Sequence, residues 1–206
     1  VGRRIGMIAG VSYIDFVIPG ILMMNVMQAA FAQTSTSLYF QRFIRHIEEV
    51  LTAPLSYFEI LVGFLAAGVV RGLITGAGVY ALALFFTSAS LEHFFAFLFY
   101  AFFVSVIFSL AGMLAGLWAD GFEQLAIPTT FIIMPFTFLG GLFYSITMLP
   151  EKLQAAALFN PFFHFVDGLR YAMIGISETN LTVGVILILA LTIILGLWVW
   201  NLLKKG

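Results

Sequence analysis

Residues 94–118 read FFAFLFYAFFVSVIFSLAGMLAGLW and contain no charged side chain. A helix needs about 20 mostly apolar residues to cross the hydrocarbon core of a bilayer, so this stretch is long enough to span it. Stretches of similar character lie at residues 13–32, 60–86, 125–143 and 181–203. Alternating segments typical of barrel strands are missing from the sequence, which leaves helices as the spanning structures. The sequence therefore predicts an all-α, polytopic helical membrane protein.

The composition points to lipid as the main surrounding of the chain. Hydrophobic residues make up 62% of the 206 residues and charged residues 9%. A soluble domain carries about 25% charged residues and could not hide so much apolar surface in one core. The net charge of −1 argues against nucleic acid as a partner, because nucleic-acid-binding faces are basic. We expect residues 1–206 to form a single transmembrane domain in a lipid bilayer.

Motifs for catalysis, metal binding or nucleotide binding are missing from the sequence. It has no glycine loop followed by Lys-Ser or Lys-Thr, so we expect this chain to bind neither ATP nor Mg²⁺. Cysteine is absent, and His46, His93 and His164 lie in separate elements without metal-ligand spacing. We therefore expect no catalytic residue, no metal site and no cofactor in this chain, and no enzyme activity.

Residues 40–51 show an amphipathic pattern beside the first span. The apolar residues follow the three-four spacing of one helix face: Phe40, Phe43, Ile44, Ile47, Val50 and Leu51. Polar and charged residues fill the other face: Gln41, Arg42, Arg45, His46, Glu48 and Glu49. Pro54 disfavours helix at the residue before it and ends the element. The pattern predicts a short helix that either lies on the lipid surface or also contacts another protein.

The stretch 144–180 is too polar and too often interrupted to be a simple span. Pro150 and Glu151 suit the first turn of a helix that continues to residue 158. Asn160-Pro161 then breaks this helix.

Helix resumes over residues 162–174. Asp167 and Arg170 are three residues apart there and could pair on one face. We expect two short re-entrant helices that dip into the outer leaflet, and a plain extracellular loop is the alternative.

A few residues inside the predicted spans carry functional interest. Asp15 lies near the start of the first span and Arg71 lies in the second. A charge at the bilayer centre costs roughly 2.5 kcal/mol or more, so Arg71 must snorkel to the cytoplasmic edge, pair, or face a watery cavity. Pro19 predicts a kink in the first span, and Pro128 and Pro135 do so in the fourth. Asp15, Pro19 and Arg71 are therefore candidates for a pathway through the membrane.

Small residues recur every four positions in two spans: Gly68, Gly72 and Gly76 in the second, and Gly112 and Gly116 in the third. Such ridges let helix backbones approach closely in lipid. The ridges could pack within one chain or between two copies, and the sequence leaves both open.

The order of these features resembles the permease subunits of type 2 ABC exporters. Four stretches carry the likeness: YIDFVIPG at 13–20, FQRFIRHIEEVLTAPLS at 40–56, Arg71-Gly72, and an outer segment that starts with GGLFYS at 140–145 and runs through Leu149-Pro150 and Asn160-Pro161 to DGLRY at 167–171. Together they cover nearly the whole chain in the family's order. The likeness is greatest to bacterial permeases that include drug and nodulation-factor exporters.

The resemblance implies a six-span permease of the bacterial inner membrane, with an amphipathic helix and a first span before residue 1. Two copies would pair as a homodimer, and each would contact a separate ATP-binding subunit that holds ATP and Mg²⁺. Residues 40–54 would be the cytoplasmic segment that couples to this subunit. Charge counting alone gives a tie between orientations; the resemblance places residues 1–12 and 144–180 outside and residues 204–205 in the cytoplasm.

The cargo implied by this reading is amphipathic, lipid-linked or drug-like. A secondary transporter or channel subunit without an ATPase partner is the alternative. Such a transporter would usually show inverted repeats and several ionisable groups within the membrane. The sequence shows no internal repeat and few such groups, which favours the ATP-driven reading.

Overall fold

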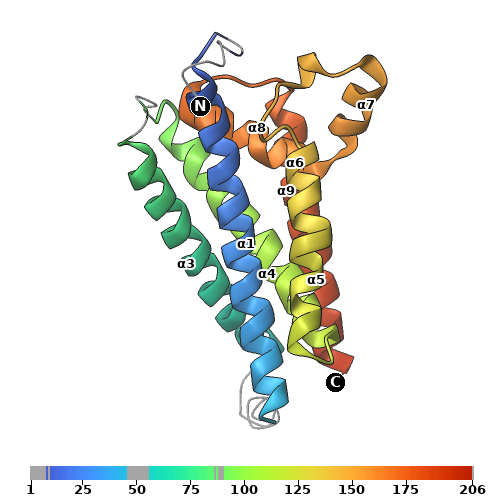
Figure 1. The fold of residues 1–206 in the computed structure, drawn as a ribbon. Coiled ribbons are helices and arrows are strands. Elements are labelled where there is room, and N and C mark those ends of the chain that lie inside the picture. The colour runs from blue at the N-terminus through green and yellow to red at the C-terminus, as the bar shows by residue number, and fades with distance from the viewer. Residues whose placement is uncertain (1–7, 9, 46–55, 86, 88–90, 206) are drawn as a thin grey trace.

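The structure is a computed structural model that describes residues 8, 10–45, 56–85, 87 and 91–205. Within this part of the chain, 5 helical segments are long and apolar enough to cross a membrane. They are α1 (Tyr13–Phe43), α3 (Tyr57–Ala83), α4 (Phe94–Trp118), a segmented helix over Phe122–Leu139, and α9 (Leu181–Lys205). Figure 1 shows these segments running along one another as a bundle. The prediction of a polytopic helical membrane protein is confirmed.

Local signals explain where the helices begin and end. At the start of α3 the Ser56 hydroxyl accepts from the Glu59 N–H, and the Glu59 carboxylate accepts from the Ser56 N–H at 2.7 Å. This reciprocal pair is a capping box. The two short outer helices are α7 (Glu151–Phe159) and α8 (Pro161–Ile174), close to the predicted bounds. Gly175 ends α8 with a φ of 69°, which a glycine adopts without strain.

The first span is longer than predicted, because α1 continues as one helix to Phe43. The stretch after residue 32 is polar, which lowers its hydropathy, yet it contains no helix breaker. The prediction of a separate helix beginning at Phe40 is therefore wrong at its start, since Phe40 and Phe43 belong to the last turn of α1. Arg45 follows with a φ of 58°, which a helix interior does not adopt. His46, Ile47, Glu48, Glu49 and Pro54 lie outside the described residues.

The fourth span is broken into pieces. It consists of a 3₁₀ turn (Phe122–Leu125), α5 (Ala126–Pro128), a π-helical segment (Thr129–Ile133) and α6 (Met134–Leu139). The Met134 N–H bonds to the Thr129 carbonyl, five residues back. Pro135 lacks an N–H, so the regular helical ladder cannot pass through it. The predicted distortion of this span is thus a π segment between two prolines, whereas α1 continues as a helix through Pro19.

The glycine ridges pack inside this chain. A Cβ added at Gly72 of α3 would lie 2.5 Å from the Ser105 hydroxyl of α4 and 3.4 Å from Ala30 of α1. A Cβ at Gly112 of α4 would lie 2.5 Å from the Phe31 carbonyl of α1. These distances leave no room for a side chain, so the glycines allow α1, α3 and α4 to form a tight three-helix unit. Of the two readings of the ridges, packing within one chain is confirmed.

Helices α7 and α8 close one end of the bundle, which we call the outer end after the orientation that the resemblance implies; the opposite end is called the inner end. In Figure 1, α7 and α8 lie at the same end as the N-terminus, away from the C-terminus. Helix α8 packs against α1, α4 and α9, and its Phe165, Val166 and Leu169 join one apolar cluster with residues of α1 and α4. It is therefore part of the core, and the plain-loop alternative is wrong.

Candidate functional site

One exposed side of α1 is made of polar and small residues, and we name it the polar face of α1. It consists of Asn25, Gln28, Ala29, Ala32, Gln33, Thr36, Ser37 and Gln41, each exposed or half-exposed. Spacings of three and four residues place them on one side of the helix. Between Ile21 and Phe40, α1 exposes no large apolar side chain. Such a surface is unsuited to lipid and suits water or a protein partner.

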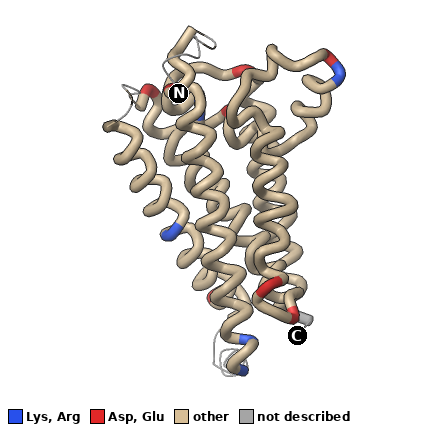
Figure 2. The backbone as a smooth tube through the Cα atoms, in the orientation of Figure 1, with Lys and Arg blue, Asp and Glu red and all other residues tan. Residues whose placement is uncertain are grey.

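Arg71 lies beside this face at mid-height of α3. At 1.5 Å per residue it is roughly 20 Å from either end of the helix, too far to be an edge residue. Its Nη1 donates to the Gln33 Oε1 at 2.6 Å, and the Gln33 Nε2 donates to the Ser37 Oγ at 3.0 Å. Of the three options for Arg71, the structure shows pairing with a neutral amide. Elsewhere, acidic and basic residues gather toward the two ends of the bundle (Figure 2).

The other pathway candidates lie nearer the outer end. Asp15 is half-exposed in the first turn of α1, and Pro19 is buried within that helix. Asp15 is 18 residues before Gln33, which corresponds to about 27 Å along the helix. The structure therefore does not bring Asp15 together with Arg71.

The inner end of α1 is tied to α4 through Arg42. Its Nη1 donates to the carbonyls of Gly116, Leu117 and Ala119, at 2.8, 2.6 and 3.2 Å. The last carbonyls of a helix lack partners within the helix and carry partial negative charge. Arg42 thus caps the C-terminus of α4.

Aromatic contacts tie the same end of α1 to the fourth span. The Tyr39 and Phe43 rings each meet the Phe122 ring edge to face, with centroids 4.6 and 5.6 Å apart. The Tyr39 hydroxyl donates to the Asp120 carbonyl at 3.1 Å. Phe40 and Arg45, two further residues of the predicted coupling segment, are exposed. A displacement of the chain just after Phe43 would therefore pull on two other spans.

At the outer end a buried cluster surrounds Arg170. Its guanidinium forms an ion pair with Glu178 at 3.3 Å and donates to the Gly141 carbonyl at 2.6 Å. It also lies 3.8 Å from the centroid of the Phe16 ring. Burial lowers the pKa of Arg170 from its ordinary value, and the carboxylates of Glu178 and Asp167 oppose this shift. Arg170 thereby joins α8 to α1, to the turn after α6 and to the loop before α9.

The expected pairing of Asp167 with Arg170 is wrong, because each group has another partner. Asp167 accepts hydrogen bonds from the Ser177 hydroxyl, the Glu178 and Thr179 N–H groups and the Thr179 hydroxyl. Arg170 takes Glu178 instead. Spacing within one helix could not reveal a loop that folds back eleven residues later.

Asn160 and Pro161 set the junction between the outer helices. The Asn160 Oδ1 accepts from the Phe162 N–H at 3.0 Å and so caps α8, where Pro161 occupies the first turn. Its Nδ2 donates to the Phe136 carbonyl of α6 at 2.7 Å. The junction therefore fixes α8 to the end of the fourth span.

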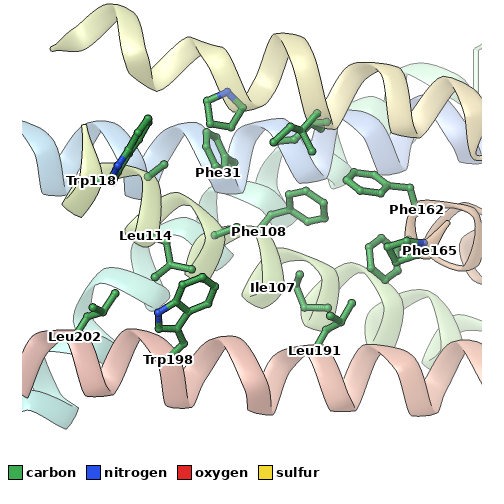
Figure 3. Close-up of a pocket in the computed structure, with 16 residues that line it drawn as sticks. Phe31, Ile107, Phe108, Leu114, Trp118, Phe162, Phe165, Leu191, Trp198 and Leu202 are labelled. Atoms are coloured by element: carbon green, nitrogen blue, oxygen red, sulfur yellow. The ribbon is translucent and has the colours of Figure 1, made fainter. Parts of the chain in front are cut away.

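An apolar cleft of about 580 Å³ separates α9 and α4 from the fourth span. Figure 3 shows side chains projecting from α9 toward α4: Leu191, Trp198 and Leu202 on one side, and Ile107, Phe108 and Leu114 on the other. Every residue that lines the cleft is apolar. It contrasts with the polar face of α1, which carries amide and hydroxyl groups.

The chain has several helices long and apolar enough to cross a membrane, and large apolar side chains are exposed on them. It is therefore a multi-pass α-helical membrane protein. The family model described as ABC-2 type transporter matches residues 4–174, and the chain belongs to that family. It is similar to the inner membrane transport permease YadH of Escherichia coli K12, with 35% identity over 206 residues, covering 100% of this chain and 80% of YadH. Nodulation protein J of Rhizobium leguminosarum bv. viciae is 30% identical over 194 residues, covering 91% of this chain and 73% of that protein.

These findings confirm the predicted family and the inner membrane as its location. The family supports a transmembrane subunit of a transporter rather than an enzyme, and it implies an ABC system with an ATP-binding partner. The polar face of α1 is the feature that our sequence reasoning missed. The sequence does contain the pattern, as Asn25, Gln28, Gln33, Thr36 and Gln41 at helical spacing. These residues are uncharged, so considering only the charged residues of a span does not find them.

Proposed function

We propose that this chain is the permease subunit of an ATP-driven ABC exporter that moves an amphipathic, lipid-linked or drug-like substrate across the bacterial inner membrane. Its partners are a second copy of itself and a separate ATP-binding subunit. The observation that carries the proposal is the attachment of the inner end of α1 to α4 through Arg42. An input applied at this end reaches two helices at once.

In this proposal residues 40–54 contact the ATP-binding subunit. Closure of the nucleotide-binding subunits moves this segment, and Arg42 transmits the motion to α4. The contacts of Tyr39 and Phe43 with Phe122 transmit it to the fourth span. The substrate passes along the polar face of α1, which offers hydrogen bonds within the membrane, and the outer helices α7 and α8 form the exit side.

The test asks whether an ATP-binding protein co-purifies with this chain, and it then measures the rate of ATP hydrolysis by that complex in reconstituted membranes. Glu48→Lys with Glu49→Lys reverses two charges in the coupling segment. Like-charge contacts at an interface can cost several kcal/mol, so we expect a stable membrane protein that loses the ATPase.

Glu151→Lys is the matched control, since it reverses an exposed charge in α7 at the outer end. It should leave the pull-down unchanged. An intact pull-down and intact coupling in the double variant would remove this segment from the coupling role. Transport that proceeds without any ATPase would instead support a secondary transporter or channel subunit.

A further inference from the structure

Arg71 lacks an acidic partner among the described residues. Within the described ranges its hydrogen bond goes to the neutral Gln33, and no ion pair with a described carboxylate is formed. The carboxylates on the same two helices lie in their first turns, Asp15 in α1 and Glu59 in α3. Glu59 is twelve residues from Arg71, about 18 Å along α3. A cation at mid-height of a span is thus left without a counter-charge from the described part of its own bundle.

A groove lies between α1 and α3 on the inner side of Arg71, and its lining ends at Ala67, one helical turn before Arg71. Its volume is about 340 Å³, and it is lined by Ser37 and Gln41 of α1 and by Glu59, Ile60, Gly63, Phe64 and Ala67 of α3. Gly63, Ala67 and Arg71 follow one another at intervals of four, so they share one side of α3. A Cβ added at Gly63 would meet nothing within 4 Å, which shows that this side is open.

The groove joins apolar and hydrogen-bonding surfaces. Ile60 and Phe64 supply apolar wall on α3, whereas Ser37 and Gln41 supply polar atoms on α1. The Gln41 Oε1 is buried and has no hydrogen-bond partner. The Gln33 amide bonds to Arg71 through its oxygen and to Ser37 through its nitrogen, and Ser37 lines the groove, so these hydrogen bonds connect the guanidinium to the groove wall. An amphiphile with an acidic group matches this arrangement.

A second copy of the chain is a poor source of the missing charge. It would bring the same helices, in which the described acids lie at helix ends and not at the depth of Arg71. An acidic group that enters the membrane with the substrate would reach that depth. Because a lone cation at that depth of a bilayer is costly, such a group would be held more tightly there than a neutral one.

We propose that Arg71 and Gln33 form an anion-binding site that takes the acidic headgroup of an amphiphile on its way across the membrane. The assignment rests on the proposed function, because it names the substrate class of the same pathway. Phosphate and carboxylate headgroups share the required chemistry. Arg71 supplies the charge, and Gln33 orients the guanidinium.

The test uses the whole chain in phosphatidylcholine nanodiscs. The sequence has no cysteine, so Gly78→Cys gives one labelling site for an environment-sensitive dye. Gly78 is exposed with open space around its Cβ, and it lies seven residues beyond Arg71 on the same side of α3. The probes are dodecyl phosphate, dodecanoate and the neutral dodecyl maltoside, each titrated to saturation.

We expect saturable binding of the two acids and none of the maltoside at the same concentrations. Arg71→Gln should weaken binding of the acids by about tenfold or more, since hydrogen bonds to charged groups are among the strongest in proteins. Arg71→Lys keeps the charge and should lose only a few-fold. Lys152→Gln removes one exposed positive charge at the outer end and should match the unsubstituted chain.

Equal binding of the maltoside, or unchanged binding of both acids in Arg71→Gln, would overturn the assignment. Binding of one acid alone would support it and identify phosphate or carboxylate as the headgroup. The ATP-binding subunit is absent from this assay. If the acids do not bind but the ATPase is still pulled down, only the anion site is contradicted. If the acids bind but the ATPase is not pulled down, only the ATP-driven function is contradicted.

Discussion

The exposed sides of α1 and α9 differ, although both helices span the membrane. Helix α9 exposes large apolar side chains along its length: Val183, Ile186, Leu189, Ile193, Ile194, Leu197 and Trp198. The polar face of α1 exposes amides, hydroxyls and small residues instead. Lipid tails match the first surface and offer no hydrogen-bond partner to the polar groups of the second. The side chains that are exposed on a single subunit therefore differ in their expected surroundings. Those of α9 suit contact with lipid, and those of the polar face of α1 suit contact with water or with another protein.

The largest expected effect comes from placing a carboxylate on each surface. Ile193 is 61% exposed near the midpoint of α9. Ile193→Asp should destabilise the fold by about 3 kcal/mol, because an aspartate at the bilayer centre is expensive. Ala32→Asp on the polar face of α1 should change stability by less than about 1 kcal/mol. The measurement is unfolding by SDS titration in mixed micelles, and equal losses would erase the distinction between the two surfaces.

A second comparison separates the two sides of α3. Gly72→Val should destabilise by about 1–3 kcal/mol, because the new side chain would collide with Ser105 and Ala30 across the three-helix unit. Gly63→Val is the matched control and should change stability by about 0.5 kcal/mol or less, since nothing lies near its Cβ. The same titration measures both. A loss in Gly63→Val as large as in Gly72→Val would mean that the open side of α3 is packed against something.

A third comparison sharpens the role of the inner end of α1. Arg42→Ala removes the hydrogen bonds to the terminal carbonyls of α4 and should lower stability by about 1–2 kcal/mol. Arg45→Ala removes an exposed side chain and should change stability by about 0.5 kcal/mol or less. If Arg42 links the helices as proposed, its variant also lowers substrate-stimulated ATP hydrolysis in the reconstituted complex. Equal stability of the two variants would contradict the capping contact.

Hydropathy predicted the spans because length and apolar composition are local properties. Helix α4 begins and ends at the predicted residues, Phe94 and Trp118. The end of α1 was placed too early, since polar residues interrupt its hydropathy but not its helix. The π segment before Pro135 follows from a missing N–H, yet its bounds depend on the neighbouring turns.

Tertiary partners account for the remaining differences. Arg170 has a neighbouring carboxylate in Asp167 and a distant one in Glu178, and it pairs with the distant one because the loop before α9 folds back onto α8. Arg42 was expected on a face that meets a partner protein, and in the structure its side chain reaches the end of α4. Such choices depend on contacts between segments far apart in the chain, which periodicity does not encode.

The most direct test of the difference between α1 and α9 is the collision accessibility of spin labels in lipid bilayers. Because the sequence contains no cysteine, Thr36→Cys and Ile193→Cys each give a single labelling site, on the polar face of α1 and on the exposed side of α9. The account predicts that the label at 193 collides mainly with oxygen, which dissolves in lipid. The label at 36 should collide mainly with a water-soluble nickel chelate. High oxygen and low nickel accessibility at both positions would contradict the account, because the polar face of α1 would then lie in lipid.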